Sequence, residues 1–205
     1  VVMVLSGNSL EHGLLMLGCY TAGVPIAPIS PAYSLMSMDH AKLKHCFGVL
    51  RPKVVFAQDS QMFARAVEAL KSLDPALKFV TVDGGGGTIP FSELAGTTPR
   101  ASVAEALDRV GHGAVAKYLF TSGSTGMPKG VPPTPGMFAG VIAGQEGLRD
   151  EPVDPDLVPL SLEWMPWSHI SAGNIGFNGA LWGGATLYLD EGKPLPGMFE
   201  TTIKN

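Results

Sequence analysis

The stretch "KYLFTSGSTGMPKGV", from Lys117 to Val131, decides how the rest of the sequence is interpreted. A short apolar run predicts a strand, and the strand gives way to hydroxyl residues and glycines before a lysine. A strand that ends in a glycine-rich turn exposes backbone N–H groups, which can surround an anion closely. The segment therefore predicts a loop that closes over a polyphosphate.

Each residue type in this loop has a chemical reason to contact phosphate. Hydroxyl groups donate hydrogen bonds, glycines let the backbone approach the anion, and the long side chain of a lysine reaches a phosphate oxygen with its charge. The candidate phosphate-binding residues share one of these three properties: Thr121, Ser122, Gly123, Ser124, Thr125, Gly126 and Lys129.

The spacing excludes two better-known motifs. A Walker loop needs G-x-x-x-x-G-K-[ST], but Lys129 is followed by Gly130, and no G-x-S-x-G nucleophile elbow occurs. A flexible Ser/Gly linker is the bland alternative, and it would give no reason for an apolar strand before the loop or for "PKGV" after it.

Composition limits the classes of protein. The chain has 205 residues, of which 45% are hydrophobic and 16% charged, so it is long enough for one globular domain with a real core. The net charge of −4 and the lack of a basic run argue against nucleic acid as a partner. Glycines and prolines interrupt the longest uncharged stretch, residues 14–37, so no membrane span is predicted.

The two cysteines, Cys19 and Cys46, fall in apolar helical patterns. This placement predicts buried free thiols in a reducing compartment, and hence a cytoplasmic protein.

Strand and helix patterns alternate along the chain. One helix, capped by Asn8 or Ser9, has Leu10, Leu14 and Leu17 on one face. Strands are expected at residues 1–5, 53–57, 79–82, 116–121, 162–167 and 185–190, and residues 24–31 are expected to be extended. A second helix has Leu43, Cys46, Phe47 and Leu50 on one stripe, and a third, capped by Ser60, has Phe63, Val67 and Leu70 facing inward. Further helices are expected at 101–110, from Pro135 with Thr134 as its cap, and at 171–183. The alternation predicts an α/β fold in which a mainly parallel sheet is flanked by helices.

Both ends of the sequence fall inside expected elements. "VVMVL" opens on a strand, and "MFETTIKN", which ends at Asn205, has already begun a helical apolar pattern. We therefore expect the 205 residues to be part of a longer protein, with apolar surface at the interrupted edges that could drive self-association.

A second candidate site surrounds "PWSH". His169 follows a predicted strand, at the edge of a parallel sheet where α/β proteins place their sites. Trp164 and Trp167 could line a pocket for an aromatic ring, although large aromatic residues at strand ends more often belong to the core. No metal ligands are assigned, because His12, His40, His45 and His112 lack metal-binding spacing.

The loop segment "YLFTSGSTGMPKGV" resembles the phosphate-binding signature of the adenylate-forming (AMP-binding) superfamily, which includes acyl-CoA synthetases, luciferases and peptide-synthetase adenylation domains. Two further stretches, "LSGNSLEHGLLMLGCYTAGVPIAPISPAYSL" and "EWMPWSHISAGNIGFNGALWGGATLYLDEGKP", are similar to feruloyl-CoA synthases, which are aryl acid–CoA ligases.

The resemblance implies a partial AMP-binding N-terminal domain over residues 1–205, with its phosphate loop at 121–130 and without a C-terminal domain. It implies activation of a carboxylic acid with ATP and Mg²⁺, followed by transfer of the acyl group to CoA. It also places His169 beside the acyl pocket and the adenylate, and makes Trp167, Gly173 and Asn174 further substrate-site candidates.

The family's adenine-binding Tyr-Gly-x-Thr-Glu segment, its ribose-binding Asp and its C-terminal catalytic Lys do not occur in this sequence. The resemblance therefore implies that the catalytic residues lie beyond Asn205 and that this chain alone is inactive. Two alternatives stay open: a non-catalytic phosphate-binding module, and an adenylating enzyme whose acceptor is a carrier-protein thiol. The acid could be ferulate, coumarate, another cinnamate or a medium-chain acid.

Overall fold

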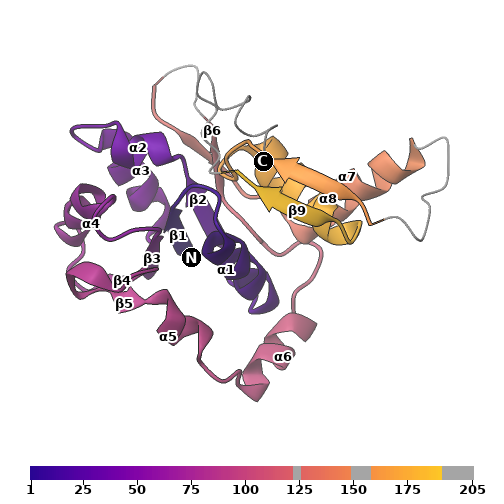
Figure 1. Cartoon of the computed structure of the whole chain (residues 1–205), viewed down its shortest axis with the longest axis horizontal. Coiled ribbons are helices and arrows are strands. Elements are labelled where there is room, and N and C mark those ends of the chain that lie inside the picture. The colour runs from indigo at the N-terminus through magenta and orange to yellow at the C-terminus, as the bar shows by residue number, and fades with distance from the viewer. Residues whose placement is uncertain (122–125, 149–157, 191–205) are drawn as a thin grey trace.

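A parallel sheet of five strands forms the centre of the computed structural model, which describes residues 1–121, 126–148 and 158–190. The strand order is β2-β1-β3-β4-β5 (Figure 1), and every neighbouring pair is parallel. The strands are β1 (Val2–Leu5), β2 (Ile26–Ile29), β3 (Val54–Ala57), β4 (Lys78–Thr81) and β5 (Ile89–Pro90). The predicted α/β class and mainly parallel sheet are confirmed.

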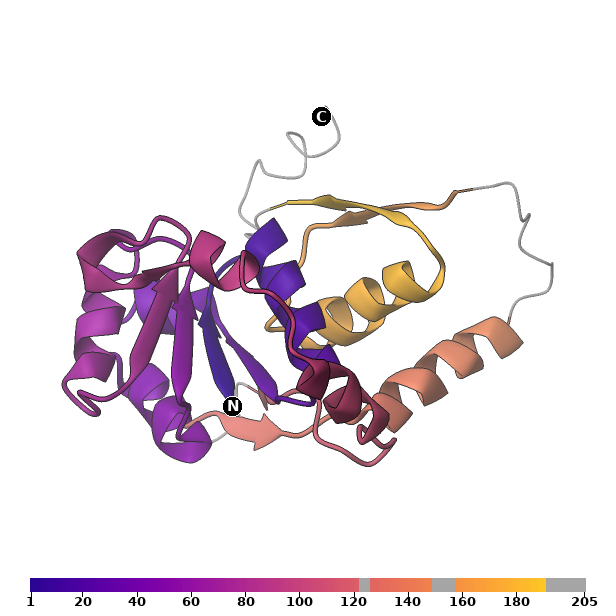
Figure 2. The ribbon, with the colours of Figure 1, turned by 90° about the horizontal axis from the view of Figure 1, so that it is seen from below.

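Helices cover both faces of this sheet because side chains alternate along each strand. Met3 and Leu5 pack toward α3 and α4, whereas Val4 packs toward α1. Figure 2 shows α1 between the sheet and the later helices. The helices of this half are α1 (Leu10–Thr21), α2 (Pro31–Leu35), α3 (Ala41–Leu50) and α4 (Ala64–Lys71).

Helix α1 begins where the sequence predicts, but it buries a different face. The Ser9 side chain accepts a hydrogen bond from the His12 N–H and caps the helix. The buried residues are His12, Gly13, Met16 and Cys19, while the leucine face borders a shallow apolar groove shared with Leu181 and Leu187. Two of these residues, His12 and Gly13, face the large ring of Trp167, which packs against this side of the helix.

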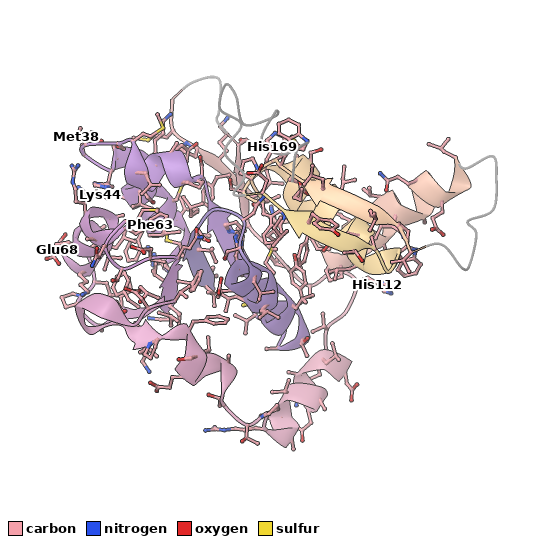
Figure 3. All side chains as sticks on the ribbon, viewed as in Figure 1. Met38, Lys44, Phe63, Glu68, His112 and His169 are labelled. Carbon is pink, nitrogen blue, oxygen red and sulfur yellow. The ribbon has the colours of Figure 1, made fainter. Side chains whose placement is uncertain are left out.

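The expected buried face of α3 and the expected cap of α4 can be compared with the structure. In α3, Leu43, Cys46 and Leu50 are buried as predicted, and both cysteines are buried free thiols. Helix α4 begins at Ala64 and is not capped by Ser60, so the expected cap is wrong. The Ser60 hydroxyl instead bonds to Asp83. The core position of Phe63 is confirmed, and Figure 3 shows it beside the helices of this face.

The second half of the chain adds two small sheets and several helices. The elements are η1 (Gly85–Gly87), α5 (Phe91–Ala95), α6 (Ala101–Asp108), β6 (Leu119–Thr121), β7 (Lys129–Val131), α7 (Pro135–Gly147), β8 (Leu160–Glu163), the π-helical turn η2 (Ser171–Gly176), α8 (Phe177–Trp182) and β9 (Thr186–Leu189). Strands β6 and β7 are antiparallel, and β8 and β9 are parallel.

The strand expected at 162–167 ends at Glu163, because the following residues turn to bond with Asn8. The helix expected at 171–183 opens as a π-helix. The cap of α7 by Thr134 is confirmed, since its hydroxyl accepts a hydrogen bond from the Met137 N–H. The helical pattern expected toward Asn205 lies outside the described residues, which end at Asp190, and it stays a prediction.

Apolar side chains also remain on the surface, among them Met137 and Val141 of α7. Within the described ranges, no helix combines the length and the apolar character that crossing a bilayer requires.

Candidate functional site

The two strands of the β6–β7 hairpin flank the predicted phosphate loop. Thr121 pairs with Lys129 across the hairpin, and the Thr121 hydroxyl lies 3.4 Å from the Lys129 carbonyl oxygen. Gly126 has φ of +117°, a conformation that side chains rarely adopt, so glycine is needed at this turn. Ser122, Gly123, Ser124 and Thr125 lie outside the described residues, and their assignments stay predictions.

Lys129 projects from the exposed strand β7. Its ammonium has no hydrogen-bond or ion-pair partner among residues 1–121, 126–148 and 158–190. A lysine that is held at its backbone but has no partner at its tip can reach an anionic ligand.

The hairpin is anchored on both sides of the loop, to the main sheet before it and to helix α3 after it. Before the loop, the Tyr118 N–H donates to the Ile26 carbonyl at 2.8 Å, and a parallel bridge joins Lys117 to Ile26. After the loop, His45 Nε2 of α3 donates to the Pro128 carbonyl at 2.9 Å. Because the bridge is parallel, β6 runs toward the carboxyl edge of the sheet, where ligands of α/β folds bind.

The turn that carries His169 is fixed to the same edge by Asn8, which follows β1. The Asn8 amide donates from Nδ2 to the Met165 carbonyl at 2.8 Å, and its Oδ1 accepts from the Trp167 N–H at 2.9 Å. We call this pair of hydrogen bonds the Asn8 clamp, and it holds the turn through backbone atoms. The β6–β7 hairpin and the His169 turn thus both lie toward the carboxyl edge.

His169 itself is exposed. Its Nδ1 accepts a hydrogen bond from the Ser171 N–H at 3.3 Å, so the neutral ring carries its proton on Nε2. Figure 3 shows His169 and His112 at different ends of the part formed by α7, α8 and β9. His169 can therefore offer one N–H donor to a ligand at the surface.

Trp167 is only 1% exposed and packs in the core. Its ring makes edge contacts with His12, at 5.1 Å between centroids, and with Phe177, at 4.9 Å. In this structure it supports the His169 turn from beneath, and its burial does not favour contact with a substrate.

Gly173 and Asn174 lie in η2, and π-helical turns occur frequently at functional sites. Gly173 is buried, and a Cβ on it would lie 3.0 Å from the Trp167 carbonyl carbon and closer still to its oxygen. The Asn174 Oδ1 is buried and has no hydrogen-bond partner within the described part of the chain. The turn therefore packs so closely on the Trp167 backbone that it requires glycine.

The sequence did not predict Asn8, His45 and Lys117 as parts of the site. Lys117 is fully buried, and its Nζ donates to the Gly173 carbonyl at 2.6 Å. Strand alternation in "AKYLF" places Lys117 on the same side as the buried Leu119, which is the signal that could have revealed it. For Asn8 and His45 no local pattern exists, since their partners are distant in sequence.

The catalytic residues themselves are expected beyond Asn205. The described residues end at Asp190, so Asn205 and the residues just before it lie outside them. The assignment of the catalytic residues to a following segment therefore stays a prediction.

Burial perturbs the titration of two neighbouring groups. It lowers the pKa of Lys117 to about 7, because the charged ammonium loses its hydration. It also lowers the pKa of His12 to about 4, and the Lys117 charge adds to this effect. The His12 Nδ1 bonds to the Gly7 carbonyl, and its Nε2 is buried without a partner among the described residues.

The free energy of unfolding is expected to rise between pH 7 and 8.5. In this window the unfolded chain keeps Lys117 protonated while the folded chain releases that proton, so raising the pH favours the folded state by at most about 1.4 kcal/mol per pH unit. Urea unfolding at several pH values measures the effect. The Lys117→Met chain should lack this rise, and an equal slope in both chains would contradict the assignment.

No group of three or more His, Cys, Asp or Glu side chains that could hold a metal ion lies within the described part of the chain. No described residue is therefore assigned to Mg²⁺.

Comparisons with known proteins agree with this geometry. The family model for the AMP-binding enzyme matches residues 1–205. The large subunit of L-2-aminoadipate reductase from Eremothecium gossypii is 34% identical over 143 residues, covering 64% of this chain and 10% of that protein. Olefin beta-lactone synthetase from Xanthomonas campestris pv. campestris is 33% identical over 134 residues, covering 63% of this chain and 22% of that protein.

Among solved structures, a malonyl-CoA ligase in a ternary product complex with methylmalonyl-CoA and AMP superposes with a TM-score of 0.65 at 21% identity. The match covers 92% of this chain and 34% of that ligase, and at this identity it shows the fold alone. The chain thus spans between a tenth and about a third of the relatives described here.

Proposed function

Because this chain belongs to the AMP-binding enzyme family, we propose that it is part of a longer acid–CoA ligase. The proposed substrate is an aryl carboxylic acid of the cinnamate or ferulate type, which ATP activates before the acyl group passes to CoA. A C-terminal domain and the catalytic residues would lie beyond Asn205. A cytoplasmic location is part of the proposal, and the free thiols Cys19 and Cys46 suit it.

The proposed reaction has two displacements. A carboxylate oxygen of the acid attacks the α-phosphorus of ATP, and the bond to pyrophosphate breaks. The thiol sulfur of CoA then attacks the acyl carbon and the bond from that carbon to the phosphate oxygen breaks. A thioester forms, AMP leaves with the bonding electron pair, and the thiol proton passes to solvent. Mg²⁺ bound with ATP would neutralise phosphate charge, with phosphate oxygens as its ligands.

The residues of this chain would position the reactants. Thr121, the loop and Lys129 would hold the β- and γ-phosphates, while His169 and Asn174 would lie beside the acyl group. The geometry supports this division, because the hairpin and the His169 turn are anchored separately and both lie toward one edge of the sheet.

One observation carries the proposal: the β6–β7 hairpin presents Lys129, which has no partner within the described ranges, beside the left-handed Gly126. This arrangement offers an anion a flexible positive charge and a close approach to the backbone. The aryl acid is supported by the similarity of residues 5–35 and 163–194 to feruloyl-CoA synthases, and CoA by the fold shared with a CoA ligase.

A second candidate is an adenylating protein whose acyl acceptor is not CoA, such as a carrier-protein thiol. The relatives named above favour keeping it, because one is a reductase subunit and another a beta-lactone synthetase. The third candidate is a module that binds phosphate without turnover.

ATP–pyrophosphate exchange tests the proposal. The longer protein encoded by the surrounding reading frame and the 205-residue chain are each assayed with ferulate, coumarate, malonate, octanoate and phenylalanine. We expect exchange by the longer protein with ferulate or coumarate to exceed that with the other acids at least about tenfold, and no exchange by the shorter chain. Mass spectrometry of the thioester formed with CoA then distinguishes CoA from a carrier-protein thiol as the acyl acceptor.

Three results would contradict parts of the proposal. If no acid supports ATP–pyrophosphate exchange, the module without turnover is favoured. If another acid is preferred, the aryl assignment is wrong. Exchange by the 205-residue chain would contradict the placement of the catalytic residues beyond Asn205. Light scattering of the 205-residue chain checks the proposed self-association through exposed apolar surface, which a monomer at high concentration would exclude.

Replacing His45 with alanine is expected to raise the KM for ATP about fivefold in the longer protein, with kcat little changed. The substitution removes one hydrogen bond, worth about 1 kcal/mol, that anchors the loop at Pro128. Exchange kinetics at varied ATP measure the effect. His112→Ala is the matched control, because His112 is exposed and its side chain makes no hydrogen bond to the β6–β7 hairpin within the described ranges. Equal KM values for the two variants would show that the bond from His45 to Pro128 plays no part in ATP binding.

A further inference from the structure

Lys117 lies between the two parts of the candidate site, and the reaction proposed above gives it no role. Its side chain is fully buried, and it has no carboxylate partner: within the described ranges, the one ion pair joins Arg109 to Glu105. A buried ammonium without a counter-ion is unfavourable relative to one in water, so its presence calls for a reason.

The backbone of Lys117 is pinned to the edge of the sheet that leads to the phosphate hairpin. The Ala116 carbonyl accepts from the Ile26 N–H at 3.1 Å, and the Tyr118 N–H donates to the Ile26 carbonyl at 2.8 Å. The Lys117 N–H points to the Pro133 carbonyl, 3.4 Å away, on the segment that leaves the hairpin. The Cα of Lys117 therefore moves only with the sheet and the hairpin.

The side chain reaches across to the other part of the site. Its Nζ donates to the Gly173 carbonyl at 2.6 Å and lies 5.7 Å from the centre of the Tyr20 ring. The titratable side chains that the structure places near it are His12 and Tyr20, both on α1. One hydrogen bond thus joins segments separated by 56 residues.

The Gly173 carbonyl occupies a special place in η2. In an α-helix it would accept from the Phe177 N–H, but that N–H donates to the Ala172 carbonyl, five residues back. The Gly173 carbonyl therefore does not receive its α-helical donor, the Phe177 N–H, and Lys117 donates a hydrogen bond to it. A methionine would fill the same space without a buried charge, so what lysine adds is this hydrogen bond.

We propose that Lys117 is a positioning residue that holds η2 in its π-helical register and thereby fixes His169 and Asn174 relative to the strand leading to Thr121. The consequence for catalysis rests on the proposed function. An acid and an α-phosphate react efficiently only when they are closely aligned, and a displacement of about 1 Å can lower a rate about 100-fold.

The first test compares Lys117→Met with Tyr20→Phe in the longer protein. For Lys117→Met we expect kcat for ATP–pyrophosphate exchange to fall at least about tenfold, while the KM for ATP changes less than about twofold because the hairpin is intact. Tyr20→Phe keeps the ring beside Lys117 and removes a hydroxyl that is buried without a partner in the described ranges, so its kinetics should match those of the unchanged protein.

The second test does not depend on activity. Hydrogen exchange is followed by mass spectrometry in the 205-residue chain, over a peptide covering residues 168–178 and over peptides from β1 and β3. In Lys117→Met the amides of η2 should exchange at least about fivefold faster, with β1 and β3 unchanged, because only the register of the turn is released.

Each outcome decides something. Faster hydrogen exchange confined to η2 supports the positioning role, whether or not the longer protein activates an acid. If the longer protein activates no acid, the proposed function is wrong but the positioning role stands. Unchanged exchange, or a rise in the KM for ATP with kcat preserved, would overturn the positioning role. If Lys117→Met fails to fold, Lys117→Gln keeps an N–H donor on a shorter chain and is measured in the same way; failure of both to fold would overturn it in favour of a purely structural role.

Discussion

Lys129→Ala is expected to lower kcat/KM for ATP about 10- to 150-fold in the longer protein. The range corresponds to the loss of one charge-assisted hydrogen bond of about 1.5–3 kcal/mol. Lys129 has the position for such a bond, because β7 holds its backbone while its ammonium has no partner within the described ranges. ATP–pyrophosphate exchange at varied ATP measures the effect, and the free energy of unfolding should change little.

Lys53→Ala is the matched control for this substitution. Lys53 is also exposed, but it immediately precedes β3 and so lies at the amino edge of the sheet, opposite the candidate site. Its removal changes the net charge of the protein equally without touching the hairpin. A loss of equal size in both variants would trace the effect to net charge, and unchanged kinetics in Lys129→Ala would remove that residue from the phosphate site.

Gly173→Val is expected to lower the free energy of unfolding by about 3 kcal/mol. A Cβ at this position would overlap the Trp167 carbonyl, which the Asn8 clamp holds in place through the Trp167 N–H. The backbone of η2 must then move away, and the short bond from Lys117 to Gly173 is lost with it. Urea or thermal unfolding of the 205-residue chain measures the change.

Gly179→Ala provides the comparison within the next helix. Nothing lies within 4 Å of a Cβ at Gly179 in α8, so alanine should be neutral or stabilise the helix by up to about 1 kcal/mol. If Gly173→Val were as stable as Gly179→Ala, the close approach of η2 to Trp167 would not exist in solution.

The alternation of helices with the central strands β1, β3 and β4 could be predicted because it depends on local patterns, whereas β5 and β7 were not expected and β2 was expected only as an extended segment. β-Branched and aromatic runs such as residues 54–57 form buried strands, and the helices between them require parallel pairing. The buried face of α1 could not be predicted in this way. Its leucine stripe is the most apolar, yet the helix turns Gly13 and Met16 inward, because that side must accommodate Trp167 from a distant part of the chain.

The candidate site likewise has one part that the sequence predicts and another that it does not. The phosphate loop could be predicted because its hydroxyls, glycines and lysine are contiguous. The contacts that position it could not, since Asn8 bonds to Met165, His45 to Pro128 and Lys117 to Gly173 over separations of 157, 83 and 56 residues. Of these three, only Lys117 left a trace in the sequence, through the alternation around it.

Under the proposed function, the Asn8 clamp has a consequence for how the acid specificity could be altered. Both of its hydrogen bonds end on main-chain atoms, the Met165 carbonyl and the Trp167 N–H, and so do not depend on which side chains the segment carries. Exposed positions such as Trp164 and His169 could then be randomised together as an exchangeable cassette while Asn8 keeps the backbone in register. The same independence would let natural variation explore new acids here without rebuilding the sheet beneath.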